Sequence, residues 1–353
     1  MFELIDGSFG EGGGQILRNS IAISALTGKP IKIENIRVKR ENPGLRPQHL
    51  LAVKAIAELC DAQLEGAYIG SRELKFIPSR IKGGNFYFDV GTAGSISLVL
   101  QAVLPVLAFA DSDSKITIKG GTAVPKAPTI EYLSQVLFKY LNKMGLKVNL
   151  EIQRHGFYPR GGGLVNVFVE RTDELSPLIL EKFGALEHLS IYSYSEGLPC
   201  HVVDREVSSS LSLLSRKSIN EDLISIEKRC NEPRSNNIGN FFIITAKGSN
   251  ASVIGYDKVG MKGLPAEKVA EEPTRELLEN IFTTNAAVDM HAGDQLLIWM
   301  SLAKGESSIF THKYTMHAYT TLYLLKKLLA IEFEVIGEID KPARIKIKGI
   351  EVK

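Results

Sequence analysis

The sequence predicts an α/β fold, more narrowly α+β, in which one small unit of helices and strands occurs three times. Two observations lead to this prediction. The same order of patterns returns about every 80 residues, and amphipathic helical patterns alternate with short strands such as residues 115–119, where every second side chain is apolar. Each unit contains a helix, a strand, a second helix and two further strands. Helices beside such strands are typical of a sheet covered on one face.

The first two units follow one another directly along the chain. The first has a glycine-rich turn at 10–14, a helix at 15–26, a strand at 30–37, a helix at 48–60 and a hairpin that ends near residue 90. The second has a turn at 91–94, a helix at 95–110, a strand at 115–119, a helix at 130–144 and a hairpin across 147–170. Glycines open the first helix of both units, which supports a common pattern.

The third unit comes after an insertion, since about 120 residues separate Glu170 from His291. It has a turn at 291–293, a helix at 294–303, a strand at 307–313, a helix at 319–329 and a hairpin across 333–352. A gap of this length is the size of a small domain. We therefore expect a main domain of residues 1–181 and 277–353, with repeats at about 1–90, 91–170 and 290–353, and an insert domain of residues 182–276. Within the insert we expect strands at 189–194 and 241–246, a helix at 207–215 and a polar loop at 230–240.

The composition of the 353 residues, with 44% hydrophobic and 23% charged side chains, is typical of an ordinary globular protein. The longest apolar stretch, residues 96–110, is interrupted by Gln101 and Pro105 and is shorter than the ~18 residues of a membrane span. The first residues carry acids where a signal peptide needs a basic and then an apolar segment. We expect a cytoplasmic protein without a membrane partner. The net charge of +2 argues against a coat on long nucleic acid but leaves room for a local basic pocket.

The three cysteines are Cys60, Cys200 and Cys230. Their odd number, wide spacing and lack of a Cys-x-x-Cys pair indicate neither a disulfide framework nor a cysteine zinc site. Cys60 ends an apolar helical pattern and is expected in the core.

Several features indicate an anion-binding site. Glycine clusters occur at 10–14, 91–95, 120–122 and 161–163, and such loops let backbone N–H groups approach a phosphate, although each cluster on its own is more commonly a tight turn. The spacings of the Walker and dinucleotide motifs are absent. Arginine binds phosphate through two parallel hydrogen bonds. Candidate cations lie near the first glycine cluster at Arg18, Arg37, Lys39, Arg40 and Arg46.

His317 stands just before the apolar helical pattern of residues 320–329, and so at a helix N-terminus. The helix dipole there disfavours imidazolium, which makes the ring a candidate nucleophile at neutral pH, although a lone histidine is more commonly structural. Glu11 lies in the glycine loop and Asp294 at the start of the third unit's helix. Their hard oxygens suit Mg²⁺ held jointly with substrate phosphates, although Asp294 could simply cap its helix. The spacing of His291, His312 and His317 matches no common zinc motif.

Residues 154–163, Arg-His-Gly-Phe-Tyr-Pro-Arg-Gly-Gly-Gly, closely resemble the signature of the RNA 3′-terminal phosphate cyclases. The resemblance covers nearly the whole chain apart from the insert, where the match is loose. It continues through residues 6–7, 10–17, 43–45, 48–50, 94, 98–101, 120–122, 127–128 and 294–295. It implies three repeats similar to the C-terminal domain of bacterial translation initiation factor three, with a thioredoxin-like α/β insert before the last repeat.

The resemblance also implies an activity. Members of this family use ATP, with Mg²⁺ or Mn²⁺, to convert an RNA 3′-phosphate end into a 2′,3′-cyclic phosphate. The reaction passes through a covalent histidine–AMP intermediate and an RNA-adenylate, and it releases pyrophosphate and AMP. A phosphate monoester has no good leaving group, and joining it to AMP supplies one for the neighbouring 2′-hydroxyl to displace. The implied partners are ATP and an RNA 3′-phosphate end, and the resemblance allows a homodimer.

The resemblance assigns roles to particular residues of this sequence. His317 falls on the family's nucleophile. Glu11 and Asp294 are the expected metal or triphosphate neighbours, and Arg18, Arg40 and Gln48 match positions near the phosphates and the RNA end. The positions that match ATP contacts are Gln101, His291, Ala292, Gly293, Asp294 and Gln295. His291 stands where some relatives carry an aromatic ring against adenine.

Three other functions fit parts of the sequence. One branch of the family lacks the histidine and serves in ribosome assembly as a non-catalytic RNA-binding protein, and the presence of His317 argues against that branch. An enolpyruvate-transfer enzyme would also use repeated α/β units and arginine-lined pockets, but it would need no covalent nucleotide. The modest charge and the lack of an aromatic RNA-recognition strand count against a plain RNA-binding module.

Overall fold

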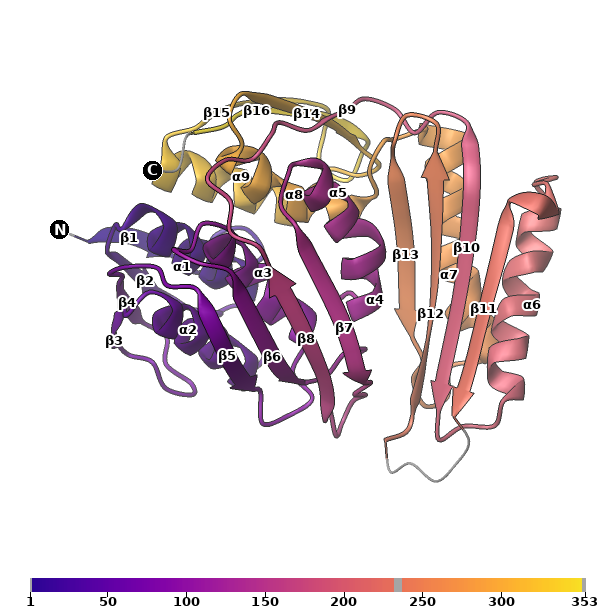
Figure 1. Cartoon of the computed structure of the whole chain (residues 1–353), viewed down its shortest axis with the longest axis horizontal. Coiled ribbons are helices and arrows are strands. Elements are labelled where there is room, and N and C mark those ends of the chain that lie inside the picture. Colours follow the sequence, from indigo (N-terminus) through magenta and orange to yellow (C-terminus); the bar gives the residue numbers. More distant parts are fainter. Residues whose placement is uncertain (1, 232–236, 351–353) are drawn as a thin grey trace.

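The computed structural model describes residues 2–231 and 237–350, and within them the strands form four sheets of four strands each (Figure 1). The first sheet has the order β1-β2-β4-β3 and is covered by the helices α1 and α2. These elements are β1 (Glu3–Asp6), α1 (Gly14–Thr27), β2 (Ile31–Glu34), α2 (Pro47–Leu59), β3 (Gln63–Glu65) and β4 (Leu74–Ile77). Only β1 and β2 pair in parallel; β2 with β4 and β3 with β4 are antiparallel.

The second and third sheets repeat the arrangement of the first. Counted along the chain, the strands of each sheet lie in the order first, second, fourth, third, and they run in the same relative directions; the order given below for the third sheet starts from its other edge. The second, β5-β6-β8-β7, is built from β5 (Gly84–Asp89), α3 (Ile96–Ala108), β6 (Ser114–Gly120), α4 (Ile130–Tyr132), the π-helical turn η1 (Leu133–Leu137), α5 (Phe138–Lys143), β7 (Val148–Arg154) and β8 (Gly163–Val169). The third, β15-β16-β14-β9, is built from β9 (Ile179–Leu180), α8 (Met290–Leu302), β14 (Glu306–Thr311), α9 (Met316–Leu329), β15 (Glu332–Ile336) and β16 (Ala343–Lys348). The end of the predicted hairpin across 333–352, residues 351 and 352, lies outside the described residues.

One strand assignment from the sequence is wrong, and one strand was missed. The sequence predicts that the first unit ends in a hairpin reaching residue 90, but β5 pairs in parallel with β6 and so belongs to the second sheet. The sequence also gives no sign of β9, which pairs in parallel with β14 across more than a hundred residues. A strand's partner depends on the tertiary fold and is not encoded in its own alternation of side chains.

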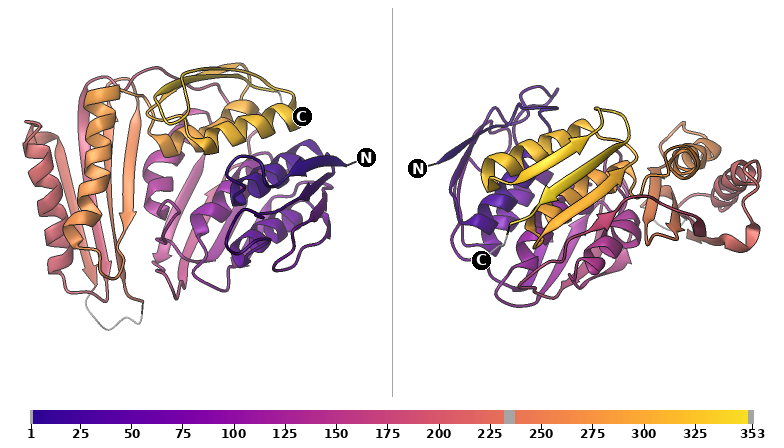
Figure 2. Two further views of the ribbon diagram at one scale, coloured as in Figure 1. Left: turned by 180° about the vertical axis from the view of Figure 1, so that it is seen from behind. Right: turned by 90° about the horizontal axis from the view of Figure 1, so that it is seen from above.

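The helices of the first three sheets pack on one another in the interior, α1 against α2, α3 and α9, and α8 against α9. Figure 2 shows these helices between the sheets, which lie on the outside. The core is accordingly built from the apolar faces of helices, as at Ile16, Leu100, Leu297 and Leu325, all of which are buried. The loops that begin α1 and α9 therefore come together although about 300 residues separate them.

The fourth sheet, β11-β10-β12-β13, stands beside the other three and has a hydrophobic core of its own (Figure 1). Its elements are β10 (Leu186–Glu196), α6 (His201–Ser215), the 3₁₀ turn η2 (Glu221–Leu223), β11 (Ile224–Asn231), β12 (Gly239–Gly248), β13 (Val253–Val259), α7 (Ala266–Glu279) and the π-helical turn η3 (Asn280–Thr284). The predicted domain boundary at residue 276 falls inside α7. Part of the predicted polar loop at 230–240, residues 232–236, lies outside the described residues.

No helix of the described chain is both long enough and apolar enough to cross a membrane.

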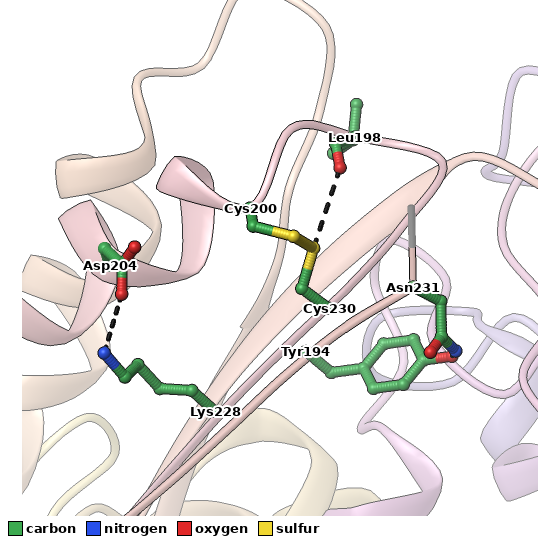
Figure 3. Close-up of a disulfide and its surroundings, with 7 residues drawn as sticks. All are labelled: Tyr194, Leu198, Cys200, Asp204, Lys228, Cys230 and Asn231. Atoms are coloured by element: carbon green, nitrogen blue, oxygen red, sulfur yellow. Dashed lines mark hydrogen bonds and ion pairs between the residues drawn. A yellow bond between two sulfur atoms is a disulfide. The ribbon is translucent and has the colours of Figure 1, made fainter. Parts of the chain in front are cut away.

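A disulfide joins Cys200 to Cys230, contrary to the prediction from cysteine number and spacing (Figure 3). Cys200 directly precedes α6 and Cys230 lies near the end of β11. Because α6 connects two parallel strands, the start of the helix and the end of β11 meet at the same end of the sheet, where the two Cα atoms are 5.5 Å apart. The spacing in sequence could not show this. Cys60 is buried in the core, as predicted.

Removing the disulfide is expected to destabilise the part of the chain around the fourth sheet. A double variant, Cys200→Ser with Cys230→Ser, frees a loop of 30 residues in the unfolded chain. We expect it to lower the free energy of unfolding by about 3 kcal/mol. Urea unfolding with and without reductant would measure the loss. Reductant should lower the stability of the wild type to that of the variant and leave the variant unchanged. Equal stability of the two proteins without reductant would contradict the prediction.

Candidate active site

His317 is the second residue of α9, so its predicted position at a helix N-terminus is confirmed. Thr315 caps the helix, and its hydroxyl oxygen accepts a hydrogen bond from the amide of Ala318 at 3.0 Å. The cap makes α9 begin at Met316, three residues before the predicted start, because a threonine that precedes the first turn satisfies one of its free N–H groups. The side chain of His317 is 44% exposed and therefore accessible to a ligand.

Glu11 lies beside this histidine. Its Oε2 atom is 3.5 Å from Nε2 of His317 and 3.3 Å from Nη2 of Arg40. The glycine loop reaches α9 only because Gly10 has no side chain: its φ is +59°, and a Cβ atom there would lie 2.3 Å from the hydroxyl oxygen of Thr320. The fold thus joins a loop at the start of the chain to a helix near its end and places a carboxylate against the imidazole.

The pKa of His317 is lowered, so its ring is neutral at neutral pH. Burial is the largest cause; the positive charges of Arg18 and Arg40 and the ring of His291 add to it, and Glu11 opposes it. The sequence predicted a neutral ring from the helix dipole; the structure adds the removal of the ring from water as a cause acting in the same direction. A neutral imidazole nitrogen with an accessible lone pair is a nucleophile.

Positive charge gathers where the glycine loop meets α1. A Cβ atom on Gly13 would lie 3.1 Å from Nη2 of Arg40, and one on Gly14 would lie 3.0 Å from Nη1 of Arg18, so both guanidinium groups approach the bare backbone of the loop. Burial lowers the pKa of Arg18 to about 10, which still leaves it charged at neutral pH. No carboxylate among residues 2–231 and 237–350 forms an ion pair with Arg18. A partly buried cation of this kind can bind an anionic ligand.

His49 contacts the same loop and was not among the predicted site residues. A Cβ atom on Gly14 would overlap its Nε2 at 2.2 Å, and Nδ1 accepts a hydrogen bond from the amide of Arg46 at 3.3 Å. Its pKa is lowered to about 3, chiefly by burial and then by the charges of Arg18, Arg37 and Arg46. His49 is therefore neutral, and it packs against the glycine loop near the arginines without adding a positive charge.

Asp294 is not at the start of α8, which corrects the sequence prediction. The helix begins at Met290 and is capped by Asp289, whose Oδ1 accepts hydrogen bonds from the amides of His291 and Ala292, each at 2.9 Å. The same oxygen accepts a hydrogen bond from the hydroxyl of Tyr132 at 2.6 Å. The predicted turn at 291–293 is thus the first turn of the helix. Competition between two aspartates five residues apart could not be decided from the sequence.

The side chain of Asp294 lies one turn inside the helix and faces α9. Its Oδ1 accepts a hydrogen bond from the hydroxyl of Thr315, the residue that caps α9. Its pKa is raised to about 7, chiefly by burial, and the negative charges of Asp289 and Glu11 contribute, while Thr315 and His291 act in the opposite direction. A carboxylate that ionises reluctantly is stabilised by a nearby cation. Thr315 therefore links the histidine's helix to the acid.

The predicted site residues separate into two sets. One set is connected by contacts or by electrostatic interaction and consists of Glu11, Arg18, Arg40, His291, Asp294 and His317. Within residues 2–231 and 237–350 no such side-chain connection is seen for the second set, which consists of Gln48, Gln101, Ala292, Gly293 and Gln295, although the last three adjoin His291 and Asp294 in α8. Gln48 instead accepts a hydrogen bond from the amide of Ser95 at 3.3 Å, at the start of α3.

Two residues of α8 have features that suit a ligand contact. His291 is partly buried, with its ring edge-on to Tyr132 at 5.9 Å and to Tyr256 at 6.4 Å between ring centroids. The Oε1 atom of Gln295 is buried without a hydrogen-bond partner among the described residues. A buried acceptor without a partner is costly in a folded protein, so a ligand that donates a hydrogen bond there would relieve that cost.

The reluctance of Asp294 to ionise predicts a pH-dependent loss of stability in metal-free protein. Its ordinary pKa is 3.8, and the folded chain keeps the proton up to about pH 7. Between these values the folded state binds more protons than the unfolded state, so stability falls as pH rises from about 4 to 7 and is constant above 7. Relative to Asp294→Asn, which keeps the acceptor for Thr315, we expect the wild type to lose about 2 kcal/mol across this window.

Urea unfolding at a series of pH values with a chelator would test this prediction. The exposed carboxylate of Asp173 supplies a control, because Asp173→Asn should keep the pH dependence of the wild type. If the free energy of unfolding changed with pH in the same way for the wild type and for Asp294→Asn, Asp294 would not be an acid whose pKa is raised by folding.

A neutral, accessible histidine beside arginine charge and two carboxylates is the kind of site expected in an enzyme that transfers phosphoryl or nucleotidyl groups. Comparison with known proteins agrees. The sequence model of the RNA 3′-terminal phosphate cyclase family matches residues 9–335. A protein named RNA 3′-terminal phosphate cyclase from Desulfurococcus amylolyticus is 44% identical over 354 residues, covering 99% of this chain and 98% of the relative. Proteins of the same name from Ignicoccus hospitalis and Pyrobaculum aerophilum are each 42% identical, covering 98% of this chain and 98% of each relative. The chain therefore belongs to the RNA 3′-terminal phosphate cyclase family.

Proposed function

We propose that this protein uses ATP to convert an RNA 3′-phosphate end into a 2′,3′-cyclic phosphate, with His317 as the covalent nucleophile. The observation that carries the proposal is the accessible, neutral ring of His317 at a helix start, 3.5 Å from Glu11 and close to the charges of Arg18 and Arg40. Membership of the cyclase family supports the same reaction.

In the first step, a ring nitrogen of His317 attacks the α-phosphorus of ATP. The bond from that phosphorus to the bridging oxygen breaks, and pyrophosphate leaves. Arg18 and Arg40 are placed to stabilise the charge on the departing pyrophosphate, since guanidinium groups bind phosphate oxygens in pairs and the site is partly shielded from water. The product is a histidine–AMP phosphoramidate.

In the second step, an oxygen of the RNA 3′-phosphate attacks the phosphorus of the bound AMP and displaces His317, which forms an RNA-adenylate. In the third step, the adjacent 2′-hydroxyl attacks the 3′-phosphorus and AMP leaves, which closes the cyclic phosphate. The last attack is intramolecular and needs mainly that the ribose be held in place. Gln48, which matches the family's RNA-end positions, is a candidate for that role.

Glu11 and Asp294 are the candidate ligands of a divalent cation. Within the described chain, no three His, Cys, Asp or Glu side chains are grouped as a ready-made metal site. The two acids nevertheless fit Mg²⁺ or Mn²⁺ that is held jointly with the triphosphate, because both offer hard oxygens, and a bound cation would offset the burial that raises the pKa of Asp294. A bound cation would supply further neutralisation of charge on the phosphates.

For the adenine end of ATP, we propose the start of α8, residues His291 to Gln295, together with Gln101 of α3. His291 and Gln295 are four residues apart and so share a face of the helix, and the Oε1 of Gln295, which has no hydrogen-bond partner among the described residues, supports a ligand there. In this arrangement Ala292 and Gly293 contribute backbone and close packing. A Cβ atom on Gly293 would lie 2.3 Å from the hydroxyl oxygen of Thr311, so α8 can approach β14 only with glycine there.

We also propose that the first three sheets with their helices are three repeats of one unit, and that the fourth sheet belongs to an insert before the last repeat. The shared strand order and directions support the repeats, and the separate core around α6 and α7 supports the insert. The similarity to translation initiation factor three and to thioredoxin is part of this proposal.

Incubation of the purified protein with α-labelled ATP and Mg²⁺, followed by denaturing electrophoresis and treatment with acid or base, tests the proposed function. We expect protein-bound label that acid removes and base does not, because a phosphoramidate is acid-labile. Label on an RNA 3′-phosphate, followed by release of AMP, would establish the acceptor. Folded protein that acquires no label would instead favour the non-catalytic RNA-binding branch of the family.

A further inference from the structure

A cavity that shares no residue with the candidate active site lies where the second and fourth sheets meet. Its volume is about 500 Å³. One wall comes from α4, η1 and the end of β7, and the other from β10 and β11. We call it the intersheet pocket. Neither the phosphate chemistry nor the signature resemblance assigns it a ligand.

Glu131 is among the residues that line this pocket, and the protein itself leaves its buried carboxyl group unsatisfied. The residue is 3% exposed, and neither carboxyl oxygen has a hydrogen-bond partner within residues 2–231 and 237–350. Burial raises the pKa of Glu131 to about 8 and lowers that of His155, 3.5 Å away, to about 4. Both side chains are therefore uncharged at neutral pH. A protonated carboxyl offers a donor and an acceptor side by side.

The fourth sheet contributes an aromatic surface to the pocket. Ser193 lies between Tyr192 and Tyr194 on β10 and donates to Glu206 of α6, so the two tyrosines lie on the face opposite the helices. Tyr194 is packed in place, 4.2 Å from the ring of His155 and stacked on Phe241 at 5.5 Å between centroids. Tyr192 is only partly buried, so its ring is available to a flat ligand.

Two arginines line the pocket where it is open to solvent. Arg154 donates from Nε to the carbonyl of Gly162 at 2.8 Å, and Arg229 pairs from Nε with Glu227 at 2.7 Å. In the described chain the terminal nitrogens of both guanidinium groups have no hydrogen-bond partner. Both side chains are exposed. Glu196 and Glu227 also line the pocket, and Glu227 pairs with Arg229, so the positive charge at the mouth comes chiefly from Arg154. The guanidinium groups at the mouth, the aromatic ring on the wall and the paired donor and acceptor of Glu131 match the three parts of a nucleotide.

We infer that the intersheet pocket binds one unpaired nucleotide of the RNA substrate, upstream of its 3′ end, with the base on Tyr192 and against Glu131 and the backbone phosphates at Arg154 and Arg229. Every base carries a neighbouring donor and acceptor on its pairing edge, so the pocket takes a base without selecting its sequence. Two arginines at the mouth suit a chain that continues outward more than a single free nucleotide. This inference rests on the proposed function only for the identity of the RNA.

The test measures binding of labelled oligoribonucleotides with a 3′-phosphate to the full chain without ATP, by fluorescence anisotropy. We expect Tyr192→Leu and Glu131→Leu each to weaken binding of a decanucleotide about tenfold, the effect of losing one base stack. A dinucleotide whose 3′-phosphate occupies the active site should bind all variants equally if the pocket takes a nucleotide further upstream. Tyr192→Phe keeps the ring and should bind as the wild type, as should Tyr87→Leu, which removes an exposed tyrosine of β5 outside the pocket.

Melting temperatures separate loss of binding from loss of folding. Glu131→Leu should melt at or above the wild type, because it removes a buried polar group that has no partner. Glu206→Leu should melt lower, because it leaves Ser193 and Asn240 without their buried partner. If Glu131→Leu also melts lower than the wild type, two other single variants decide. Glu131→Gln should retain the affinity for the decanucleotide, and Tyr192→Leu should lose it.

Unchanged decanucleotide affinity in both folded pocket variants would overturn the inference. An equal loss of affinity for free AMP in these variants would assign the pocket to a mononucleotide and overturn the RNA assignment. Labelling by α-labelled ATP in the same preparations reports separately on the proposed function. If α-labelled ATP labels the protein but the pocket variants bind RNA as the wild type does, the proposed function stands and only the inference about the intersheet pocket is overturned.

Discussion

Replacing His317 by alanine is expected to abolish the transfer of AMP from ATP to the protein, a loss of at least about a thousandfold in rate, because no other group can take the place of a covalent nucleophile. The fold should survive. The side chain is 44% exposed, and the cap of α9 is made by Thr315 and not by the histidine. The melting temperature should therefore stay close to that of the wild type.

The measurement is protein-bound label from α-labelled ATP, with melting followed in parallel. His201→Ala is a matched control, since His201 is also an exposed histidine in the first turn of a helix, α6. It should label as the wild type does. Full labelling of His317→Ala would exclude His317 as the nucleophile. Loss of labelling together with a large fall in melting temperature would show that the side chain has a structural role as well.

Replacing Arg18 by methionine is expected to slow pyrophosphate release by about a hundredfold to a thousandfold, the usual effect of removing one preorganised group that stabilises developing negative charge. Arg18 is suited to this role because it is charged, poorly hydrated and without a carboxylate partner among the described residues. Methionine keeps much of the aliphatic volume. Because an unpaired buried charge is lost, the variant should be as stable as the wild type or more so.

Steady-state rates of pyrophosphate release at a series of ATP concentrations measure this effect. A fall mainly in kcat would show that Arg18 acts in the transition state. A rise in KM alone would show that Arg18 binds the triphosphate equally well in the ground state and in the transition state. Arg18→Lys should recover only part of the rate, since an ammonium group cannot form two parallel hydrogen bonds. Arg275→Met, at an exposed arginine of α7, is the control and should leave the rate unchanged. A wild-type rate in Arg18→Met would remove Arg18 from the site.

Local patterns in the sequence were sufficient for much of the fold. The helices α1, α2 and α9 occur where apolar periodicity predicts them, each within three residues of the predicted start. Their cores and caps depend on neighbours along the chain, such as Thr315 for α9, and a single sequence contains that information. The same holds for the position of His317 at a helix start and for Cys60 in the core.

The sequence alone therefore determined the order of most helices and strands and the residue types that can perform phosphate chemistry. The tertiary structure decided which of them meet. It placed Glu11 against His317 across about 300 residues, chose Asp289 over Asp294 as the cap of α8, gave β5 to the second sheet, joined Cys200 to Cys230 and left Glu131 without a partner in the intersheet pocket. The physical reason is that helix periodicity and capping are interactions over a few residues, whereas proximity, burial and the pKa shifts that follow from burial depend on how distant segments pack.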